Sequence, residues 1–115
     1  MYKMSRRIST DEIMECVAEA FGINKSNLKL NTREVWICRP RQMSMYFMRH
    51  YTNLTCKDIA KIFGFKNHTT VLHADERIGN IKQKDNADLF KLFWKADNNI
   101  ESVIYRNGYI DTYTP

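Results

Sequence analysis

Apolar residues recur at helical spacing near the start of the chain. Residues three or four positions apart share one helix face. The members of this face are Ile13, Cys16, Val17, Ala20 and Phe21. Ser9 followed three residues later by Glu12 forms a capping box, and Gly22 favours helix termination. The pattern therefore predicts a helix that begins after Ser9 and ends before Gly22.

The middle of the chain predicts a second, central helix. Its apolar and aromatic stripe consists of Met43, Tyr46, Phe47 and His50. Pro40 is tolerated in a first helical turn, so we expect the helix to begin there. Before it, residues 24–28 favour a short helical turn, and the sequence KLNTREVWIC predicts a loop, with extended backbone as an option. We interpret the stripe as core.

Two further helices follow in close succession. Thr55 with Asp58 predicts a helix start, and the apolar face that follows is Cys56, Ile59, Ile62 and Phe63. Gly64, Phe65 and Lys66 then separate this short helix from one that opens at Asn67. The inward face of the longer helix is Val71, Ala74, Ile78 and Ile81. A short helix, a turn with glycine and a longer helix are typical of a helix-turn-helix.

A last amphipathic helix is predicted from about Asp85, with the apolar residues Leu89, Leu92, Phe93 and Ala96. The chain thus predicts an all-α fold, a compact helical domain with a helix-turn-helix and a basic loop. We expect a flexible N-terminus at residues 1–8, the domain at residues 9–106 and a C-terminal tail at residues 107–115.

Composition narrows the class of protein. The 115 residues suffice for one domain. No apolar run approaches the roughly 20 residues of a membrane span, and the N-terminus lacks the apolar segment of a signal peptide. We therefore expect a cytoplasmic protein without a membrane partner.

The sequence shows no residue pattern typical of a metal or cofactor site. Cysteines 16, 38 and 56 show no C-x-x-C spacing, so we interpret each as a small core residue. The three histidines show no i, i+4 pair. No carboxylate pair or nucleophile-base pair is discernible. We expect no metal, no cofactor and no catalytic residues.

Positive charge is concentrated in the middle of the chain. The net charge of the whole chain is +5. Residues 25–66 carry nine Lys and Arg against two acidic residues, a local balance of +7, while each flank is −1. Such a region suits a polyanion, although charge alone is equally compatible with a solvated surface.

The polar start of the second helix of the motif suits base-pair edges. Thr69 and His73 fall opposite the apolar face and point outward together. Asn67 can act as N-cap, but His68, Thr69 and Thr70 are not explained by capping. Asn can pair with adenine, Thr can contact a thymine methyl group, and His can donate or accept. In isolation, we interpret this helix start as a polar cap with a satisfied histidine; together with the preceding helix and the basic region, DNA contact is favoured.

The region RPRQMSMYFMRHYTNLTCKDIAKIFGFKNHTTVLHADERI, with STDEIMECVAEAFGI and NTREVWICRPRQ before it, resembles the C-terminal DNA-binding domain of the bacterial replication initiator DnaA. The resemblance covers roughly residues 9–83. It implies an all-helical domain that binds double-stranded DnaA-box DNA. By position Arg33 matches the arginine that enters the minor groove. The base-reading positions are His68, Thr69 and Thr70, and the phosphate-contacting positions lie at or near Gln42, Thr52, Lys57 and Lys66.

Further candidates are Arg41 in the PRQ motif, Asn53 in TNL, and Asn67 and His73 on the second helix of the motif. The family usually has Asp where this chain has Asn67.

The function we expect is sequence-specific binding at DnaA-box-like sites by a stand-alone replication or transcription regulator, nucleoid-associated in a bacterial or phage-infected cell. The chain has no G-x-x-x-x-G-K-[ST] loop, so no nucleotide partner is expected.

An excised domain of a longer initiator is an alternative, against which the initial Met and the tail argue. A second alternative is a protein-interaction module that uses Leu89, Phe93 and Trp94, although we favour ordinary core packing for these residues. Protein partners stay unassigned.

Overall fold

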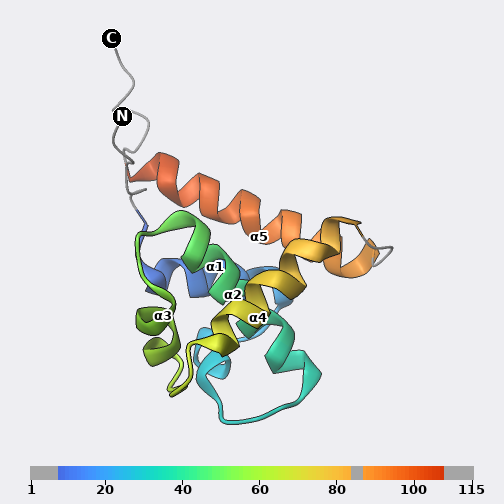
Figure 1. Cartoon of the computed structure of the whole chain (residues 1–115). Helices are drawn as coiled ribbons and strands as arrows, with labels where there is room; N and C mark the ends of the chain where they lie inside the picture. Colours follow the sequence, from blue (N-terminus) through green and yellow to red (C-terminus); the bar gives the residue numbers. More distant parts are fainter. Residues whose placement is uncertain (1–7, 84–86, 108–115) are drawn as a thin grey trace.

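The computed structural model describes residues 8–83 and 87–107. Within these ranges all regular structure is helical, which confirms the predicted all-α fold. The elements in chain order are α1 (Thr10–Phe21), η1 (Lys25–Lys29), α2 (Val35–Tyr51), α3 (Cys56–Ile62), α4 (Thr69–Gly79), η2 (Asn80–Gln83) and α5 (Ala87–Arg106), where η denotes a 3-10 helix. In Figure 1, α5 runs across the top, and the loop before α2 lies at the bottom, near the start of α4.

The first helix follows its sequence signals. The hydroxyl of Ser9 accepts from the Glu12 backbone N–H at 3.1 Å, and the Glu12 carboxylate accepts from the Ser9 N–H at 3.0 Å. Gly22 ends α1 at φ 72°, a left-handed conformation that glycine adopts without strain. The predicted capping box and C-terminal glycine are therefore confirmed, and residues 25–29 form the predicted short helical turn.

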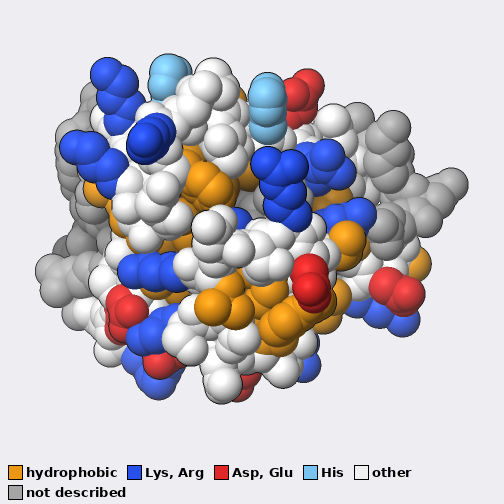
Figure 2. All heavy atoms as spheres, turned by 90° about the horizontal axis from the view of Figure 1, so that it is seen from below, with side chains coloured by type: hydrophobic (Ala, Val, Ile, Leu, Met, Phe, Trp, Pro, Cys, Tyr) orange, Lys and Arg blue, Asp and Glu red, His pale blue; other side chains and the backbone are white. Residues whose placement is uncertain are grey.

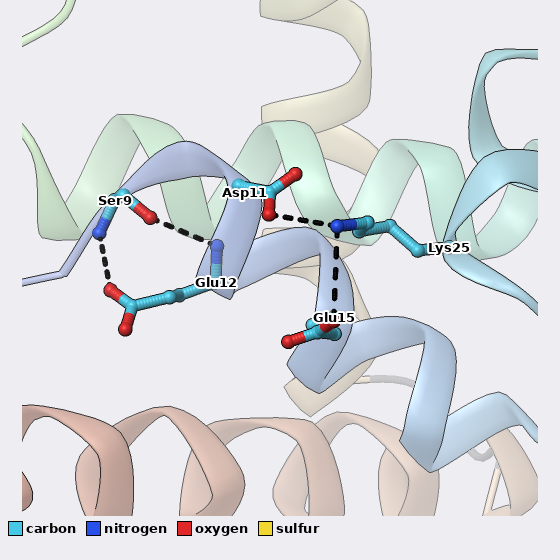
Figure 3. A network of polar contacts seen from close by, with 5 residues as sticks. All are labelled: Ser9, Asp11, Glu12, Glu15 and Lys25. Atoms are coloured by element: carbon cyan, nitrogen blue, oxygen red, sulfur yellow. Dashed lines mark hydrogen bonds and ion pairs between the residues drawn. The ribbon is translucent and has the colours of Figure 1, made fainter.

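An ion pair ties this turn to α1 (Figure 3). Lys25 Nζ lies 2.7 Å from a carboxylate oxygen of Asp11 and 3.7 Å from one of Glu15. The hydrogen bond to Asp11 raises the pKa of Lys25 above its ordinary value. The pair is exposed on the acidic side, so it fixes the orientation of the turn more than it stabilises the fold.

The start of α2 differs from the prediction. The helix begins at Val35, five residues before Pro40, so Pro40 lies inside the helix and not in its first turn. The N–H groups of Ile37 and Cys38 already donate to the Glu34 carbonyl at 3.0 and 2.9 Å. Ile37 is completely buried, and its packing favours a helical conformation ahead of the proline. The loop predicted for this region is therefore reduced to residues 30–34.

The core surrounds α2, which packs against α1, α3 and α4, while α1 also packs against α5. Phe47 on α2 is 1% exposed and stacks on Phe93 of α5 with ring centroids 5.0 Å apart. Met43 and Phe47 of the predicted stripe are buried as expected, and Tyr46 is half-buried. His50 is exposed, because it lies at the rim where α2 meets α4.

For residues at the edges of the core, the structure differs from several smaller predictions. Ile8, which we assigned to the flexible N-terminus, is buried in the core. Among the three cysteines only Cys16 is buried, and burial is the main cause that raises its pKa to about 11. Residues 1–7 of the predicted N-terminus, the predicted start of the last helix at Asp85 and residues 108–115 of the predicted tail lie outside the described residues.

The last helix buries its predicted apolar face. Leu89, Phe93 and Ala96 are at most 7% exposed, so core packing accounts for them. Trp94, by contrast, is 47% exposed. No helix in the described part of the chain is long and apolar enough to cross a membrane.

Candidate nucleic-acid interface

The helix-turn-helix predicted from the sequence is present. Thr55 caps α3 through its hydroxyl, which accepts from the Asp58 N–H at 3.1 Å, while the Asp58 carboxylate accepts from the Thr55 N–H at 3.2 Å. The hydrogen bond from the Thr55 backbone N–H to the Asp58 carboxylate is the main cause that lowers the pKa of Asp58, and hydrogen bonding by the Thr55 side chain to the same carboxylate lowers it further. Gly64 turns the chain at φ 78°, and the Phe65 N–H donates to the Ala60 carbonyl at 2.9 Å. The turn thus fixes the direction in which the chain enters α4.

The start of α4 lies two residues later than predicted, at Thr69. Asn67 nevertheless caps the helix, because its side-chain oxygen accepts from the Thr69 N–H at 2.9 Å. His68 has helical backbone angles and makes no side-chain cap bond. Asn67 and His68 are exposed, and Thr69 and Thr70 are partly exposed. The polar side chains at this end therefore face solvent, as an interface to base edges requires.

The inner side of α4 is fixed by packing. Val71, Ala74 and Ile78 are at most 2% exposed, and Ile81 follows in η2 at 5%. His73, on the opposite side, is exposed as predicted. Because the apolar face is held against α2, the rotation of α4 about its axis is set, and so is the direction of its polar residues.

An ion-pair cluster adds a second link between α2 and α4. Asp75 on α4 accepts from Arg49 Nη1 at 2.7 Å and lies 2.8 Å from His50 Nε2. The Tyr46 ring lies beside His50, with centroids 4.2 Å apart. Asp75 is thus paired with Arg49 and His50 of α2, while Glu76, the other acidic residue of α4, is exposed.

The loop of residues 30–34, which carries Arg33 and Glu34, lies beside α4. Arg33 is exposed at its tip region. Arg41, predicted as a DNA-contacting residue, has a different place: it is 8% exposed, and its Nη2 donates to the carbonyls of Thr32 at 2.8 Å and Leu30 at 3.3 Å. Its guanidinium is thus hydrogen-bonded to the loop and largely buried, and contact between Arg41 and DNA stays a prediction.

A hollow of about 430 Å³ separates the loop from α4. It brings together five of the predicted residues: Arg33, Arg41, Gln42, Thr70 and His73. The Gln42 side-chain oxygen is buried there and has no hydrogen-bond partner in the described structure. The hollow is open, so a polar or anionic group can reach it from solvent.

Of the seven predicted residues outside this hollow, Asn67, His68 and Thr69 form the start of α4, and the other four lie around α3. The Thr52 hydroxyl donates to the Met48 carbonyl at 2.5 Å and accepts from the Leu54 N–H at 3.2 Å, so it serves the end of α2. Asn53, Lys57 and Lys66 are exposed. Figure 2 shows the lower face of the molecule, where Lys and Arg side chains gather together with histidine. Five of the nine basic residues in 25–66 are exposed and form no ion pair in the described structure, so a polyanion can approach them. They are Lys29, Arg33, Lys57, Lys61 and Lys66.

Two arginines were missed by sequence reasoning. Arg39 and Arg77 line a second hollow of about 490 Å³ with His73, Glu76 and Asn80. Arg77 follows His73 by four residues, which is one helical turn, and this spacing was the available signal. Arg39 had no such signal, because α2 was expected to begin after it.

Within residues 8–83 and 87–107, groups of three His, Cys, Asp or Glu side chains able to hold a metal ion do not occur. The site instead consists of an exposed helix start, the Arg33 loop and lysines around them.

Comparison with known proteins agrees with this geometry. The bacterial DnaA protein helix-turn-helix family matches residues 10–78. The chromosomal replication initiator protein DnaA of Bdellovibrio bacteriovorus is 42% identical over 78 residues, covering 68% of this chain and 17% of the relative. The protein of the same name from Synechococcus sp. is 39% identical over 79 residues, covering 69% and 17%.

A third relative, the chromosomal replication initiator protein DnaA of Caulobacter vibrioides, is 37% identical over 82 residues, covering 71% and 17%. The chain therefore spans about a sixth of the length of these relatives. The family match includes α1 to α4 with the complete helix-turn-helix. The chain belongs to the bacterial DnaA helix-turn-helix family.

Proposed function

We propose that this protein binds double-stranded DNA in a sequence-specific manner at DnaA-box-like sites. The observation that supports this most is the arrangement of two reading elements on one side of the molecule. The exposed start of α4 and the Arg33 loop lie on either side of the 430 Å³ hollow. The strand backbone that separates two adjacent DNA grooves fits between two such elements.

In this proposal α4 enters the major groove with its first turn. The major groove is about 12 Å wide and admits a helix. His68, Thr69 and Thr70 then meet base edges, and Asn67 joins them through its amide group while its oxygen keeps the cap bond to Thr69. His73, one turn further on, lies at the rim of the hollow and meets the strand backbone.

Arg33 is proposed to enter the adjacent minor groove. Arginine is attracted by the enhanced negative potential of narrow, A·T-rich minor grooves. The side chain is exposed at residue 33 of a short loop, and the described structure gives it no ion pair. It is therefore available to a groove without first breaking an internal contact.

The outer residues are proposed to contact phosphates. Lys57 and Lys66 are exposed on α3 and in the turn, and Gln42 lines the hollow. Thr52 and Asn53 lie at the start of the motif, where the chain passes from α2 to α3. Such contacts set position and register, while base contacts set sequence preference.

We further propose that the protein acts as a stand-alone replication or transcription regulator in the bacterial cytoplasm, associated with the nucleoid, and has no ATP-hydrolysing step of its own. The 115 residues contain no G-x-x-x-x-G-K-[ST] sequence. In the chromosomal replication initiator proteins DnaA of Synechococcus sp. and Bdellovibrio bacteriovorus, the matched region is only 17% of the protein. DNA occupancy alone is then the regulatory event.

The test is a binding assay by fluorescence anisotropy with a labelled DnaA-box duplex and a scrambled duplex of equal length. Specific binding typically exceeds nonspecific binding by about 10³-fold or more. A clear preference for the box supports the proposal. Equal affinity for both duplexes at physiological salt contradicts sequence-specific recognition, and absence of binding to either contradicts DNA binding altogether.

A further inference from the structure

Arg41 connects three parts of the molecule that the proposed DNA interface needs in fixed relation. Its backbone belongs to α2, and its Nη2 donates to two carbonyls of the Arg33 loop, those of Thr32 at 2.8 Å and Leu30 at 3.3 Å. Its guanidinium carbon also lies 5.5 Å from the ring centroid of Phe65, in the turn that leads to α4. One side chain therefore spans from the loop to the helix-turn-helix.

The environment of this arginine is unusual for a surface basic residue. It is 8% exposed, and within the described structure no carboxylate forms an ion pair with it. Its Nε is buried without a hydrogen-bond partner in the same part of the chain. The two loop carbonyls and the Phe65 ring thus provide most of the stabilisation of the buried positive charge. A neutral side chain cannot make the same charge-dependent interactions.

The loop itself has few other constraints. Its internal hydrogen bonds are from the Thr32 N–H to the Leu30 carbonyl at 3.0 Å and from the Glu34 N–H to the Thr32 hydroxyl at 3.2 Å. Leu30 is 46% exposed, so apolar packing anchors the loop only in part. The Cys38 thiol of α2 also donates to the Thr32 carbonyl, at 3.7 Å. The two Arg41 hydrogen bonds are the shorter links between α2 and the loop.

We propose that Arg41 is a positioning residue for DNA recognition, which holds the Arg33 loop at the spacing from α4 that two adjacent grooves require. The inference rests on the proposed function, since it concerns how Arg33 is presented to DNA. Functional side chains must be held within about 0.5 Å of their working geometry. Without the two Arg41 hydrogen bonds, the loop presents Arg33 over a wider range of positions, and Arg33 binds the minor groove less well.

The competing role is direct contact between Arg41 and a phosphate, and a double-mutant cycle separates the two. We compare wild type, Arg41→Gln, Arg33→Ala and the double variant on box duplexes with A·T-rich or G·C-rich flanks. Lys91→Gln, an exposed charge on α5, controls for the change in net charge. Each protein is measured over a salt series, since each neutralised phosphate contributes about −0.9 to the log-log slope.

If Arg41 acts through Arg33, each single variant loses about five- to tenfold in preference for the A·T flank, within the range expected for one good groove contact. The double variant then loses less than about twofold more than Arg33→Ala, and its salt slope equals that of Arg33→Ala. A full additional loss in the double variant, or a slope shallower by about 0.9, overturns the proposal in favour of direct phosphate contact.

A measurement without DNA tests the role of Arg41 independently of the proposed DNA binding. Amide exchange followed by NMR should show faster exchange at Thr32 and Glu34 in Arg41→Gln, with α1 and α5 unchanged. Phe65→Leu keeps the Arg41 charge and removes the ring, and it should show the same changes to a smaller extent. Unchanged loop exchange in both variants overturns the bracing role, whereas equal wild-type affinity for box and scrambled duplexes overturns only the proposed function.

Discussion

The substitution Asn67→Asp separates the structural role of residue 67 from its proposed reading role. The Asn67 side-chain oxygen accepts from the Thr69 N–H at 2.9 Å, and an aspartate presents an oxygen at the same place. Asn and Asp cap helices about equally well. The amide nitrogen, however, is replaced by a second acceptor, so the outward-facing group changes from donor to anion.

The expected effect on stability is small and favourable. An aspartate at an exposed helix N-terminus gains about 0.3–1 kcal/mol from the helix dipole. For a domain of this size about 1 kcal/mol corresponds to roughly 4 °C, so the melting temperature should rise by about 1–4 °C. Asn67→Ala, the matched control, removes the cap bond and should cost about 1 kcal/mol, or roughly 4 °C.

The expected effect on DNA is larger and depends on sequence. Asn can donate to and accept from adenine, whereas Asp can only accept, which favours a cytosine amino group. Asn67→Asp should therefore shift preference toward cytosine at one position by about 1–3 kcal/mol. The added negative charge should also weaken binding to every duplex.

The assay is a binding series over duplexes varied at each base pair of a DnaA-box core, with wild type, Asn67→Asp and Asn67→Ala side by side. Thermal unfolding by circular dichroism is measured on the same samples. If wild type and Asn67→Asp share one base preference at every position, Asn67 does not read bases. If Asn67→Asp melts several degrees below wild type, the capping argument is wrong.

Four further predictions test other parts of the structure. Arg33→Ala should weaken binding mainly to duplexes with an A·T-rich flank, because arginine favours narrow minor grooves; equal affinity of both proteins for all flanks contradicts this role. Binding of wild type should fall steeply with salt, by about 0.9 in log-log slope for each phosphate contact, and a flat response counts against a phosphate-contacting face. Phe47→Ala should lower the free energy of unfolding by about 3–5 kcal/mol in urea denaturation, because the side chain is 1% exposed and stacks on Phe93; a loss below about 1 kcal/mol refutes its core role. The Asp58 pKa is lowered in the folded state, so its contribution is present above its unfolded pKa of about 4 and is lost as pH falls through the folded value. Asp58→Asn should flatten the acid branch of the melting-temperature profile, and an unchanged branch argues against this linkage.

The sequence by itself determined the local structure. The capping boxes at Ser9 and Thr55, the glycine at the end of α1 and the buried faces of α1, α4 and α5 all follow from residues three or four positions apart. Such interactions close within one helical turn, so their spacing can be read without knowing the fold. The helix-turn-helix and the exposed polar start of α4 were predictable for the same reason.

Resemblance to the family, rather than spacing, pointed to Arg33 and to the residues around α3. The sequence showed that positive charge is concentrated in residues 25–66, but it did not show which surface of the molecule carries this charge. For these residues the sequence named candidates, and their exposure in the structure makes the proposed contacts physically accessible.

Tertiary structure alone decided the start of α2, the contacts of Arg41 and the pairing of Asp75. Packing of the fully buried Ile37 extends α2 ahead of Pro40, against the local preference for proline in a first turn. Arg41 contacts carbonyls 9 and 11 residues away, and Asp75 meets Arg49 and His50 across 26 and 25 residues. These contacts form only after α2, the loop and α4 come together, so no local pattern contains them; the energy of long-range packing, not helix propensity, determines where they lie.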